Sequence, residues 1–286
     1  MAESEARDLL SKANKKAEQK GWFGGRKYDE AAELYERAAN QFKIAKLWDE
    51  SGNAFMKVAE MRTKNNEIED SAMSYIAASK SYKKQSPESS IDALKQAISI
   101  LIQKGRFHSA ANHQKEIAKM YETDLVDFES SMKAYETAAE WYSSEDSTAL
   151  ANGCLLKVAT FAAQLEEYRK AIDIFETIAA GSIDNQLTKW SIKDYFLKAG
   201  MCYLAAKDTI GAQKAVDRYK DMDMSFGKTR ECKLLENVIE DINNEDIDSF
   251  TNHVADFDRL TQLDSWKASL LLKAKNYISD QDDSLM

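Results

Sequence analysis

The chain is poor in proline, glycine and cysteine, and it has no long apolar run. One proline and 10 glycines in 286 residues leave little material for strands, hairpin turns or a proline-rich linker. The 3 cysteines, Cys154, Cys202 and Cys232, are widely spaced and odd in number, which argues against a disulfide framework or a zinc knuckle. No apolar run reaches the ~18 residues of a membrane-spanning helix, and the N-terminus has no apolar signal core. We therefore expect a reduced, cytosolic, soluble protein.

Residue patterns typical of active sites are also missing. His108 and His113 are five positions apart and do not share a helix face, unlike the i, i+4 histidines of a zinc protease. The sequence FGKTR at 226–230 imitates the end of a phosphate-binding loop, but Met222 occupies a position that requires glycine. The sequence thus predicts no enzyme activity, no metal site and no cofactor, and it predicts a solvated Lys228.

The charge balance is acidic, with 39 Lys and Arg against 48 Asp and Glu and a net charge of −9. This balance argues against general nucleic-acid binding, which favours a basic surface. Most of the acidic excess lies in residues 144–286, which hold 25 acidic and 17 basic residues. The two ends of the chain therefore suit different partners.

What the sequence does contain is one helical phrase in four versions: YDEAAELYERAA, IEDSAMSYIAAS, FESSMKAYETAA and YRKAIDIFETIA. The central aromatic residues, Tyr35, Tyr75, Tyr135 and Phe175, are 40, 60 and 40 residues apart. Multiples of 20 correspond to about one helix plus one turn. The period therefore predicts a stack of helices.

The first phrase places small and aromatic residues on one helical stripe: Tyr28, Ala31, Ala32, Tyr35, Ala38, Ala39 and Phe42. Closely packed helix pairs need this alternation, because a ring on one helix fits where its neighbour has only a methyl group. Together with the period, the stripe predicts an all-α fold: a right-handed TPR-like α-solenoid of antiparallel helix hairpins with a C-terminal helical bundle.

The helical pattern divides into fourteen segments: 3–19, 28–43, 48–64, 68–84, 87–104, 107–122, 127–143, 147–164, 167–180, 187–206, 209–220, 228–243, 246–262 and 264–279. Pro87 fits the first position of its helix, and Ser86 is the expected N-cap. Beyond residue 220 the repeat phrase is lost and the helices become acidic and leucine-rich. We expect a repeat domain at 1–220, with an apolar loop at 20–27, and a terminal bundle with an acidic tail at 221–286.

A loop with two adjacent large apolar residues, Trp22 and Phe23, lies between the first two predicted helices. Glycines flank them, and Lys20, Arg26 and Lys27 stand close by. Such a tip can enter the headgroup region of an anionic membrane. Alternatively, both side chains fold back onto the first hairpin, and the residues alone leave both interpretations open.

Basic residues occur among the acids of the repeat helices, including Arg106, Lys157, Lys193 and Lys198. On a concave solenoid wall they would suit an elongated acidic partner such as a helical bundle. The alternative is an ordinary solvated face. At the C-terminal end, residues 236–264 hold nine acidic residues with the single Lys or Arg being Arg259. This end favours a basic partner, or else its tail is an inert frayed end.

Several long strings resemble one known family: FGGRKYDEAAELYERAANQFK, SGNAF, GRFHSAANHQKEIAKMYETDLVD, CLLKVA, FAAQLEEYRKAIDIFE, KDYFLKAG and TRECKLL. Through them the chain resembles the soluble NSF attachment proteins, the alpha-SNAP family, along nearly its full length. It is similar to a fungal or other lower-eukaryote member.

This resemblance implies a non-enzymatic adaptor in vesicle-mediated transport and membrane fusion. Members wrap a SNARE four-helix bundle of syntaxin, SNAP-25-like and synaptobrevin-type helices, and they recruit the NSF-type hexameric AAA ATPase, which pulls the bundle apart. The resemblance also implies a cytoplasmic protein in peripheral contact with membranes, with no nucleic acid as partner. The alternative from the residues alone is a generic TPR-like scaffold that binds peptides.

The resemblance carries over to particular positions. Arg106, Lys157, Lys193 and Arg230 match basic family positions and are the expected SNARE-binding residues. Asn112 and Gly153 stand where animal relatives commonly have lysine, so the SNARE surface is expected to be weaker here or shifted to neighbours such as Lys115.

At the other end, Asp208 and Glu240 match acidic family positions, and Leu285 matches the penultimate leucine implicated in stimulating the ATPase. These three are the expected ATPase contacts. Trp22 and Phe23 match the family's apolar membrane-contact loop, which is shorter here than in animal members.

Overall fold

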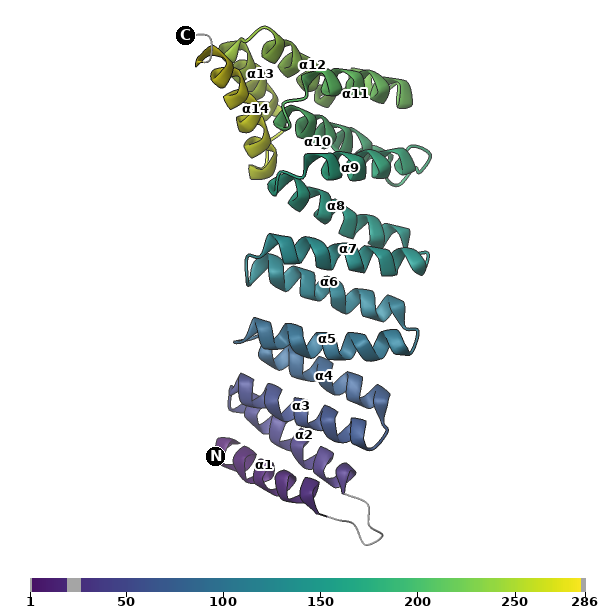
Figure 1. Cartoon of the computed structure of the whole chain (residues 1–286), viewed down its shortest axis with the longest axis vertical. Coiled ribbons are helices and arrows are strands. Elements are labelled where there is room, and N and C mark those ends of the chain that lie inside the picture. Colours follow the sequence, from purple (N-terminus) through teal and green to yellow (C-terminus); the bar gives the residue numbers. More distant parts are fainter. Residues whose placement is uncertain (1, 20–26, 284–286) are drawn as a thin grey trace. The chain divides into compact units, whose positions relative to one another are not determined.

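The structure is a computed structural model that describes residues 2–19 and 27–283, with side chains described as far as Ile278. Within these ranges it contains fourteen α-helices, two short 3-10 helices and no strand (Figure 1). The first seven helices are α1 (Ala2–Glu18), α2 (Tyr28–Ile44), α3 (Trp48–Lys64), α4 (Ile68–Tyr82), α5 (Pro87–Gln103), α6 (Phe107–Thr123) and α7 (Phe128–Ser144). They are followed by α8 (Thr148–Gln164), α9 (Tyr168–Ser182), α10 (Ile192–Ala205), α11 (Thr209–Met222), α12 (Arg230–Asn243), α13 (Ile247–Leu260) and α14 (Ser265–Asp283). The all-α prediction is confirmed.

Most of the turns between helices contain one residue with a left-handed backbone, and these residues recur at intervals close to multiples of 20. They are Lys46, Asn66, Gly105, Val126, Asp146, Glu166, Lys207 and Glu245. At the first of them, the amide of Lys46 donates to the Lys43 carbonyl at 3.0 Å and the amide of Leu47 donates to the Phe42 carbonyl at 2.9 Å. This is a Schellman helix end, which satisfies the last carbonyls of one helix while reversing the chain into the next. The 20-residue sequence period is therefore the length of one helix and its turn.

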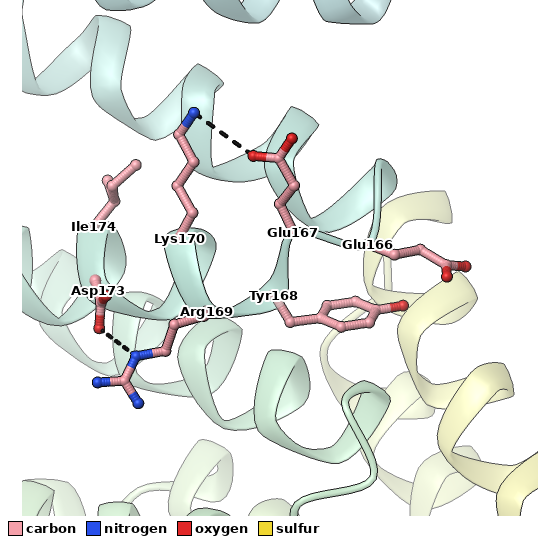
Figure 2. Close-up of a pocket in the computed structure, with 7 residues that line it drawn as sticks. All are labelled: Glu166, Glu167, Tyr168, Arg169, Lys170, Asp173 and Ile174. Atoms are coloured by element: carbon pink, nitrogen blue, oxygen red, sulfur yellow. Dashed lines mark ion pairs between the residues drawn. The ribbon is translucent and has the colours of Figure 1, made fainter.

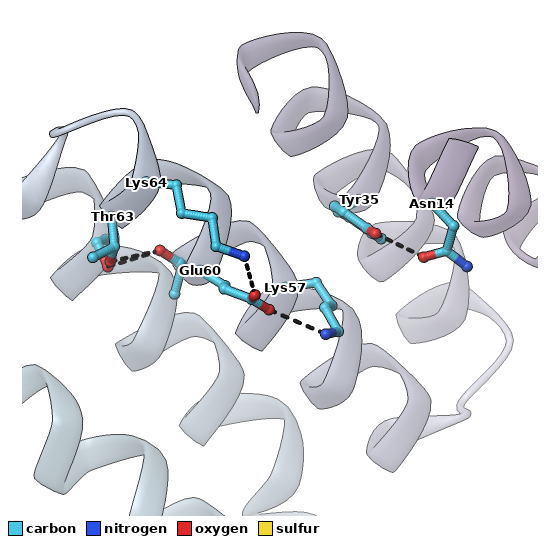
Figure 3. A network of polar contacts seen from close by, with 8 residues as sticks. Asn14, Tyr35, Lys57, Glu60, Thr63 and Lys64 are labelled. Carbon is cyan, nitrogen blue, oxygen red and sulfur yellow. Dashed lines mark hydrogen bonds and ion pairs between the residues drawn. The ribbon is translucent and has the colours of Figure 1, made fainter. Parts of the chain in front are cut away.

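The stripe predicted in α2 faces the core. Ala31, Ala32, Tyr35, Ala38, Ala39 and Phe42 are all buried, while Tyr28 is half-buried. The Tyr35 hydroxyl donates to Asn14 Oδ1 of α1 at 2.7 Å (Figure 3). The same kind of bond recurs between other neighbouring helices, from Tyr82 to Asn53 at 2.7 Å and from Tyr142 to Asn112 at 2.6 Å. Each bond satisfies a mostly buried tyrosine whose ring fills the space beside the alanines.

Two helical glycines allow neighbouring side chains to approach the backbone. A Cβ at Gly52 of α3 would overlap the ring of Tyr82, and a Cβ at Gly200 of α10 would lie 2.6 Å from Leu235 Cδ1 of α12. Any larger residue would displace these buried side chains from their places in the core. The close approaches explain why glycine occupies these two helical positions.

The chain divides into two compact units, Met1–Cys154 and Leu155–Met286, and the division falls within α8. In the first unit, α1 to α7 follow one another with each helix contacting the next. In the second, α14 contacts α10, α12 and α13 (Figure 1). The expected boundary at residue 220 lies two residues before the end of α11 and stays a prediction.

Local corrections concern helix starts. The helix expected at 187–206 begins only at Ile192, after a 3-10 turn at Lys189–Ser191. Ser86 occupies the N-cap position before Pro87, as expected, although its side chain makes no capping hydrogen bond. The position is set by the proline, whose fixed φ suits a first helical residue.

The FGKTR segment is structural. Phe226 begins a 3-10 turn and is fully buried against Phe196 and Tyr219. Thr229 accepts a hydrogen bond from the Cys232 amide at 3.1 Å and so caps α12. Lys228 is exposed, as predicted.

The three cysteines are free and buried. Burial raises the pKa of the Cys154 thiol, that of Cys202 to about 12 and that of Cys232 to about 11. Thiols with pKa values raised in this way stay protonated near neutral pH and make poor nucleophiles. The cysteines therefore act as small core residues.

Candidate functional site

Two of the expected partner-binding cations, Lys193 and Arg230, lie at the starts of α10 and α12, which an ion pair between Lys193 and the buried carboxylate of Glu231 connects. Lys193 Nζ lies 2.8 Å from Glu231 Oε1, and Glu231 is only 7% exposed. Lys193 is the second residue of α10, Arg230 is the first of α12, and the side chain of Lys193 is about half exposed. A buried carboxylate needs a partner, so the pair fixes Lys193 beside the start of α12.

The location of these cations is unfavourable for the helices themselves. The N-terminus of a helix carries a partial positive charge, and a cation there typically costs about 0.3–1 kcal/mol. Lys193 and Arg230 both lie in first turns, and Arg106 holds the N-cap position of α6. Free amides and side-chain cations together attract an anionic partner. The arrangement favours recognition of acidic groups over helix stability.

Arg230 also borders a surface pocket between α12 and α13. The pocket is lined by Arg230, Lys233, Leu234, Asn237, His253, Asp256, Phe257 and Leu260. His253 Nδ1 lies 2.7 Å from Oδ2 of Asp241, which is 5% exposed. That pair joins α12 to α13 and holds the pocket walls together.

Two apolar residues that the sequence analysis did not single out are highly exposed just before Lys193. Leu187 is 91% exposed and Trp190 is 84% exposed, in the connection between α9 and α10. Both lie within the segment 187–206 that the sequence pattern predicts to be helical, before the point where α10 begins at Ile192. Large apolar side chains held in water next to cations are typical of a protein-binding surface.

The other expected cations are placed separately. Lys157 is an exposed residue of α8, with its Nζ 6.0 Å from the centre of the Phe161 ring. Arg106 belongs to the Met1–Cys154 unit, is exposed, and lies 4.0 Å from Glu69 Oε2. Such a long, exposed ion pair contributes little and leaves Arg106 available to a stronger acidic partner.

The two positions expected to lack a family lysine have different surroundings. Asn112 accepts the hydroxyl hydrogen of Tyr142, which is 1% exposed, so this asparagine has a packing role. Gly153 is exposed on α8, and a Cβ built on it would meet nothing within 4 Å. A longer side chain at Gly153 would therefore extend into solvent.

The expected ATPase-contact residues that the structure describes, Asp208 and Glu240, lie at helix ends. Asp208 is exposed and its Oδ1 accepts the Gly211 amide at 2.8 Å, capping α11. Glu240 is exposed near the end of α12. Leu285, like Trp22 and Phe23, lies outside the described residues.

A second pocket lies at the turn between α8 and α9 and the start of α9, lined by Glu166, Glu167, Tyr168, Arg169, Lys170, Asp173 and Ile174 (Figure 2). Its charges pair with one another: Lys170 Nζ lies 3.6 Å from Glu167, and Arg169 Nε lies 3.2 Å from Asp173. Such self-paired surface charges are typical of a solvated helix end.

Neither a metal cluster nor a membrane span emerges from the described part of the chain. Residues 2–19 and 27–283 hold no group of three or more His, Cys, Asp or Glu that could bind a metal ion. None of their helices is both long and apolar enough to cross a bilayer.

The fold defines an α-helical repeat protein of the tetratricopeptide-like class. Its described helices align with those of a signal-transduction ATPase with a tetratricopeptide repeat sensor from Pyrococcus horikoshii, at 13% identity and a TM-score of 0.50, over 96% of this chain and 44% of that one. This likeness shows the fold alone.

Sequence comparison is more specific. The family model described as soluble NSF attachment protein, SNAP, matches residues 4–279. The beta-soluble NSF attachment protein of Bos taurus is 43% identical over 96% of this chain and 94% of its own length. The alpha-soluble NSF attachment protein of Dictyostelium discoideum is 44% identical over 99% of both chains. The probable vesicular-fusion protein sec17 homolog of Schizosaccharomyces pombe is 42% identical over 97% of both. The chain belongs to the soluble NSF attachment protein family.

The family expectation from the sequence is therefore confirmed. The identities to these mammalian, amoebal and yeast relatives are nearly equal, so the expected fungal or lower-eukaryote origin stays a prediction.

Proposed function

We propose that this protein is a cytosolic adaptor that binds assembled SNARE four-helix bundles and recruits and stimulates the NSF-type AAA ATPase for SNARE disassembly. The observation that carries the proposal is the family match over residues 4–279, which leaves no described helix outside the family pattern. In this role the chain supplies binding surfaces, and the ATPase supplies the energy for pulling the bundle apart.

The SNARE-binding surface would comprise Arg106, Lys157, Lys193 and Arg230. Support comes from the exposure of Arg106, Lys157 and Arg230 and from the position of Lys193 and Arg230 at adjoining helix starts. Acidic side chains on a SNARE bundle would compete with Glu231 for Lys193 and would meet Arg230 directly. Charge complementarity of this kind sets orientation and association rate more than affinity.

Leu187 and Trp190 would add the apolar part of the same surface. Cations alone leave a wet, salt-sensitive contact, whereas an aromatic residue and a leucine can bury area against a helix bundle. Leu187 and Trp190 lie six and three residues before Lys193 in the chain. Both are exposed to water in the free protein, so their burial against a partner would contribute hydrophobic free energy to binding.

The ATPase-facing end would use Asp208, Glu240 and Leu285, and the membrane contact would use Trp22 and Phe23. Asp208 and Glu240 are exposed, which suits contact with a basic partner. For Leu285, Trp22 and Phe23 the support is the family resemblance. Apolar residues beside cations would give weak, reversible association with an anionic membrane surface.

A reconstituted disassembly reaction tests the proposal. A fluorescently labelled SNARE bundle is incubated with purified NSF-type ATPase, ATP and this protein, and loss of energy transfer between the labelled helices is followed. Disassembly is expected only when this protein and ATP are both present. Full disassembly in reactions without the protein, or none with folded protein and an active ATPase, would contradict the proposed function.

A further inference from the structure

One carboxylate of α10, that of Asp194, connects the helix that carries Lys193 to the C-terminal helix α14. Asp194 Oδ1 lies 2.7 Å from Lys267 Nζ of α14, and Oδ2 lies 2.8 Å from Lys198 Nζ of its own helix. Each oxygen thus has one cationic partner. The Lys267 side chain is 14% exposed and that of Asp194 is 37% exposed, so the lysine is the more shielded partner and depends on the carboxylates next to it.

An aromatic contact anchors α14 at the same point. Trp266, the residue before Lys267, is buried; its indole Nε1 donates to the Thr160 carbonyl of α8 at 3.0 Å. Its ring meets Phe175 of α9 edge-on, with 5.9 Å between ring centres, and Lys198 Nζ lies 5.8 Å from the centre of the Phe175 ring. The first turn of α14 is therefore fixed to α8, α9 and α10 by a hydrogen bond, a ring contact and an ion pair.

A second ion pair farther along α14 differs in its surroundings. Lys273 Nζ lies 2.6 Å from Glu166 Oε1, but these side chains are 39% and 67% exposed. Solvent screens such a pair, and exposed pairs contribute little. The chain thus offers a comparison on one helix: a pair with a largely buried lysine at its start and a more exposed pair in its middle.

We propose that the Asp194–Lys267 ion pair is a positioning contact that couples SNARE binding at α10 to ATPase stimulation through α14. The inference rests on the proposed function. Asp194 lies between Lys193, on the SNARE-binding surface, and the first turn of the helix that leads to the C-terminal tail. With the pair intact, α14 keeps one orientation relative to α10. Without it, each surface can still bind its partner, but α14 no longer has a fixed orientation relative to α10.

The decisive variant is Lys267→Met, which keeps the length and apolar stem of the side chain and removes the ion pair. Lys267→Arg serves as the conservative variant that can still pair with Asp194, and Lys273→Met serves as the matched control at the exposed pair. Three quantities are measured on the full chain: affinity for the SNARE bundle, the rate of ATP-dependent disassembly, and hydrogen exchange of the α14 amides by mass spectrometry.

We expect Lys267→Met to leave SNARE affinity within about twofold, to speed exchange in the first turns of α14, and to slow disassembly by about fivefold or more, the range of measured coupling effects. Lys267→Arg and Lys273→Met should stay within about twofold of the unchanged chain on all three measurements. A split between binding and disassembly distinguishes positioning from general loss of structure.

Disassembly by Lys267→Met at the unchanged rate would overturn the inference. So would a loss of SNARE affinity as large as the loss of rate, since that would indicate a merely structural role. If the unchanged chain supports no disassembly, the proposed function itself fails. That outcome differs from one in which the unchanged chain supports disassembly and Lys267→Met does so at the same rate.

Discussion

Lys193 of α10 and Glu231 of α12 form an ion pair of 2.8 Å in which the carboxylate is buried and the ammonium group is about half exposed. Lys193 therefore has two tasks. It neutralises Glu231 inside the protein, and it presents positive charge at the proposed SNARE-binding surface. Its substitution changes folding and binding together, which affects how the surface can be tested.

Lys193→Glu should destabilise the fold as well as weaken SNARE binding. The new carboxylate would face Glu231, leaving a buried charge without its partner, at a cost of about 2 kcal/mol after allowing for the solvent that reaches Lys193. Thermal unfolding followed by circular dichroism should show a lower Tm. Lys157→Glu, at an exposed position of α8, is the control and should lower the Tm less than Lys193→Glu while weakening SNARE binding. Equal Tm values for both variants would contradict the role of Glu231.

Arg230→Glu should weaken SNARE binding without lowering the stability of the fold. Arg230 is the first residue of α12, where a negative charge interacts favourably with the helix dipole, by about 0.3–1 kcal/mol. The variant is therefore expected to be at least as stable as the unchanged chain, yet to bind SNARE bundles more weakly. Binding is measured by titration at two salt concentrations. Lys228→Glu, on the neighbouring 3-10 turn, is the control; an equal loss of binding there would show a nonspecific effect of charge.

Gly153→Lys should strengthen both the helix and the proposed SNARE surface. A side chain at this position meets open space, and replacing a glycine inside a helix gains about 0.5–1 kcal/mol. The new cation would lie one helical turn from Lys157 on α8. Gly181→Lys, at an exposed glycine of α9 with equally open space, is the matched control. We expect higher SNARE affinity for the first variant than for the second, and equal affinities would argue against α8 as a contact.

Val126→Gly should stabilise the protein. Val126 adopts a φ of 54° in the turn between α6 and α7 and is 63% exposed. A β-branched residue in the left-handed region is strained, typically by about 1–2 kcal/mol, and little buried area is lost on substitution. Urea unfolding should give a free energy of unfolding higher by about 1 kcal/mol. Lys119→Gly, at an exposed helical position of α6, should lower it by a similar amount.

Glu116→Gln should make the protein lose less stability as the pH is lowered. A hydrogen bond from His113, and a further one from Lys83, lower the pKa of the Glu116 carboxyl to about 2 from 4.5, although partial burial acts in the opposite direction. Because the folded-state pKa is the lower one, its contribution is fully present above the unfolded pKa. It is lost as pH falls from about 4.5 through about 2. Tm values measured across that window should fall less steeply for the variant. Glu33→Gln, at an exposed position of α2, is the control for the loss of one surface carboxylate.

Much of the fold follows from local sequence. The alternation of alanine with Tyr35 and its equivalents has the helical period and defines which face of each helix is buried, because neighbouring helices leave room for a ring only opposite a small residue. The helix segments predicted at 48–64, 87–104 and 147–164 agree within one residue with α3, α5 and α8. The start predicted at 187 differs most, because the 3-10 turn Lys189–Ser191 precedes α10, and the start predicted at 228 falls on the 3-10 turn Phe226–Lys228. The end predicted at 279 falls four residues before the end of α14.

The sequence by itself determined the all-α repeat, its helix lengths and the family, because these depend on residues within one or two helical turns of each other and on long matching strings. Only the tertiary structure decided the partners of the charged groups: Lys193 with Glu231, Asp194 with Lys267 and Asn112 with Tyr142. It also showed that Leu187 and Trp190 are left in water. Each of these pairs joins residues on different helices, 30 or more positions apart, and helical periodicity carries no information about which side chains meet across that distance.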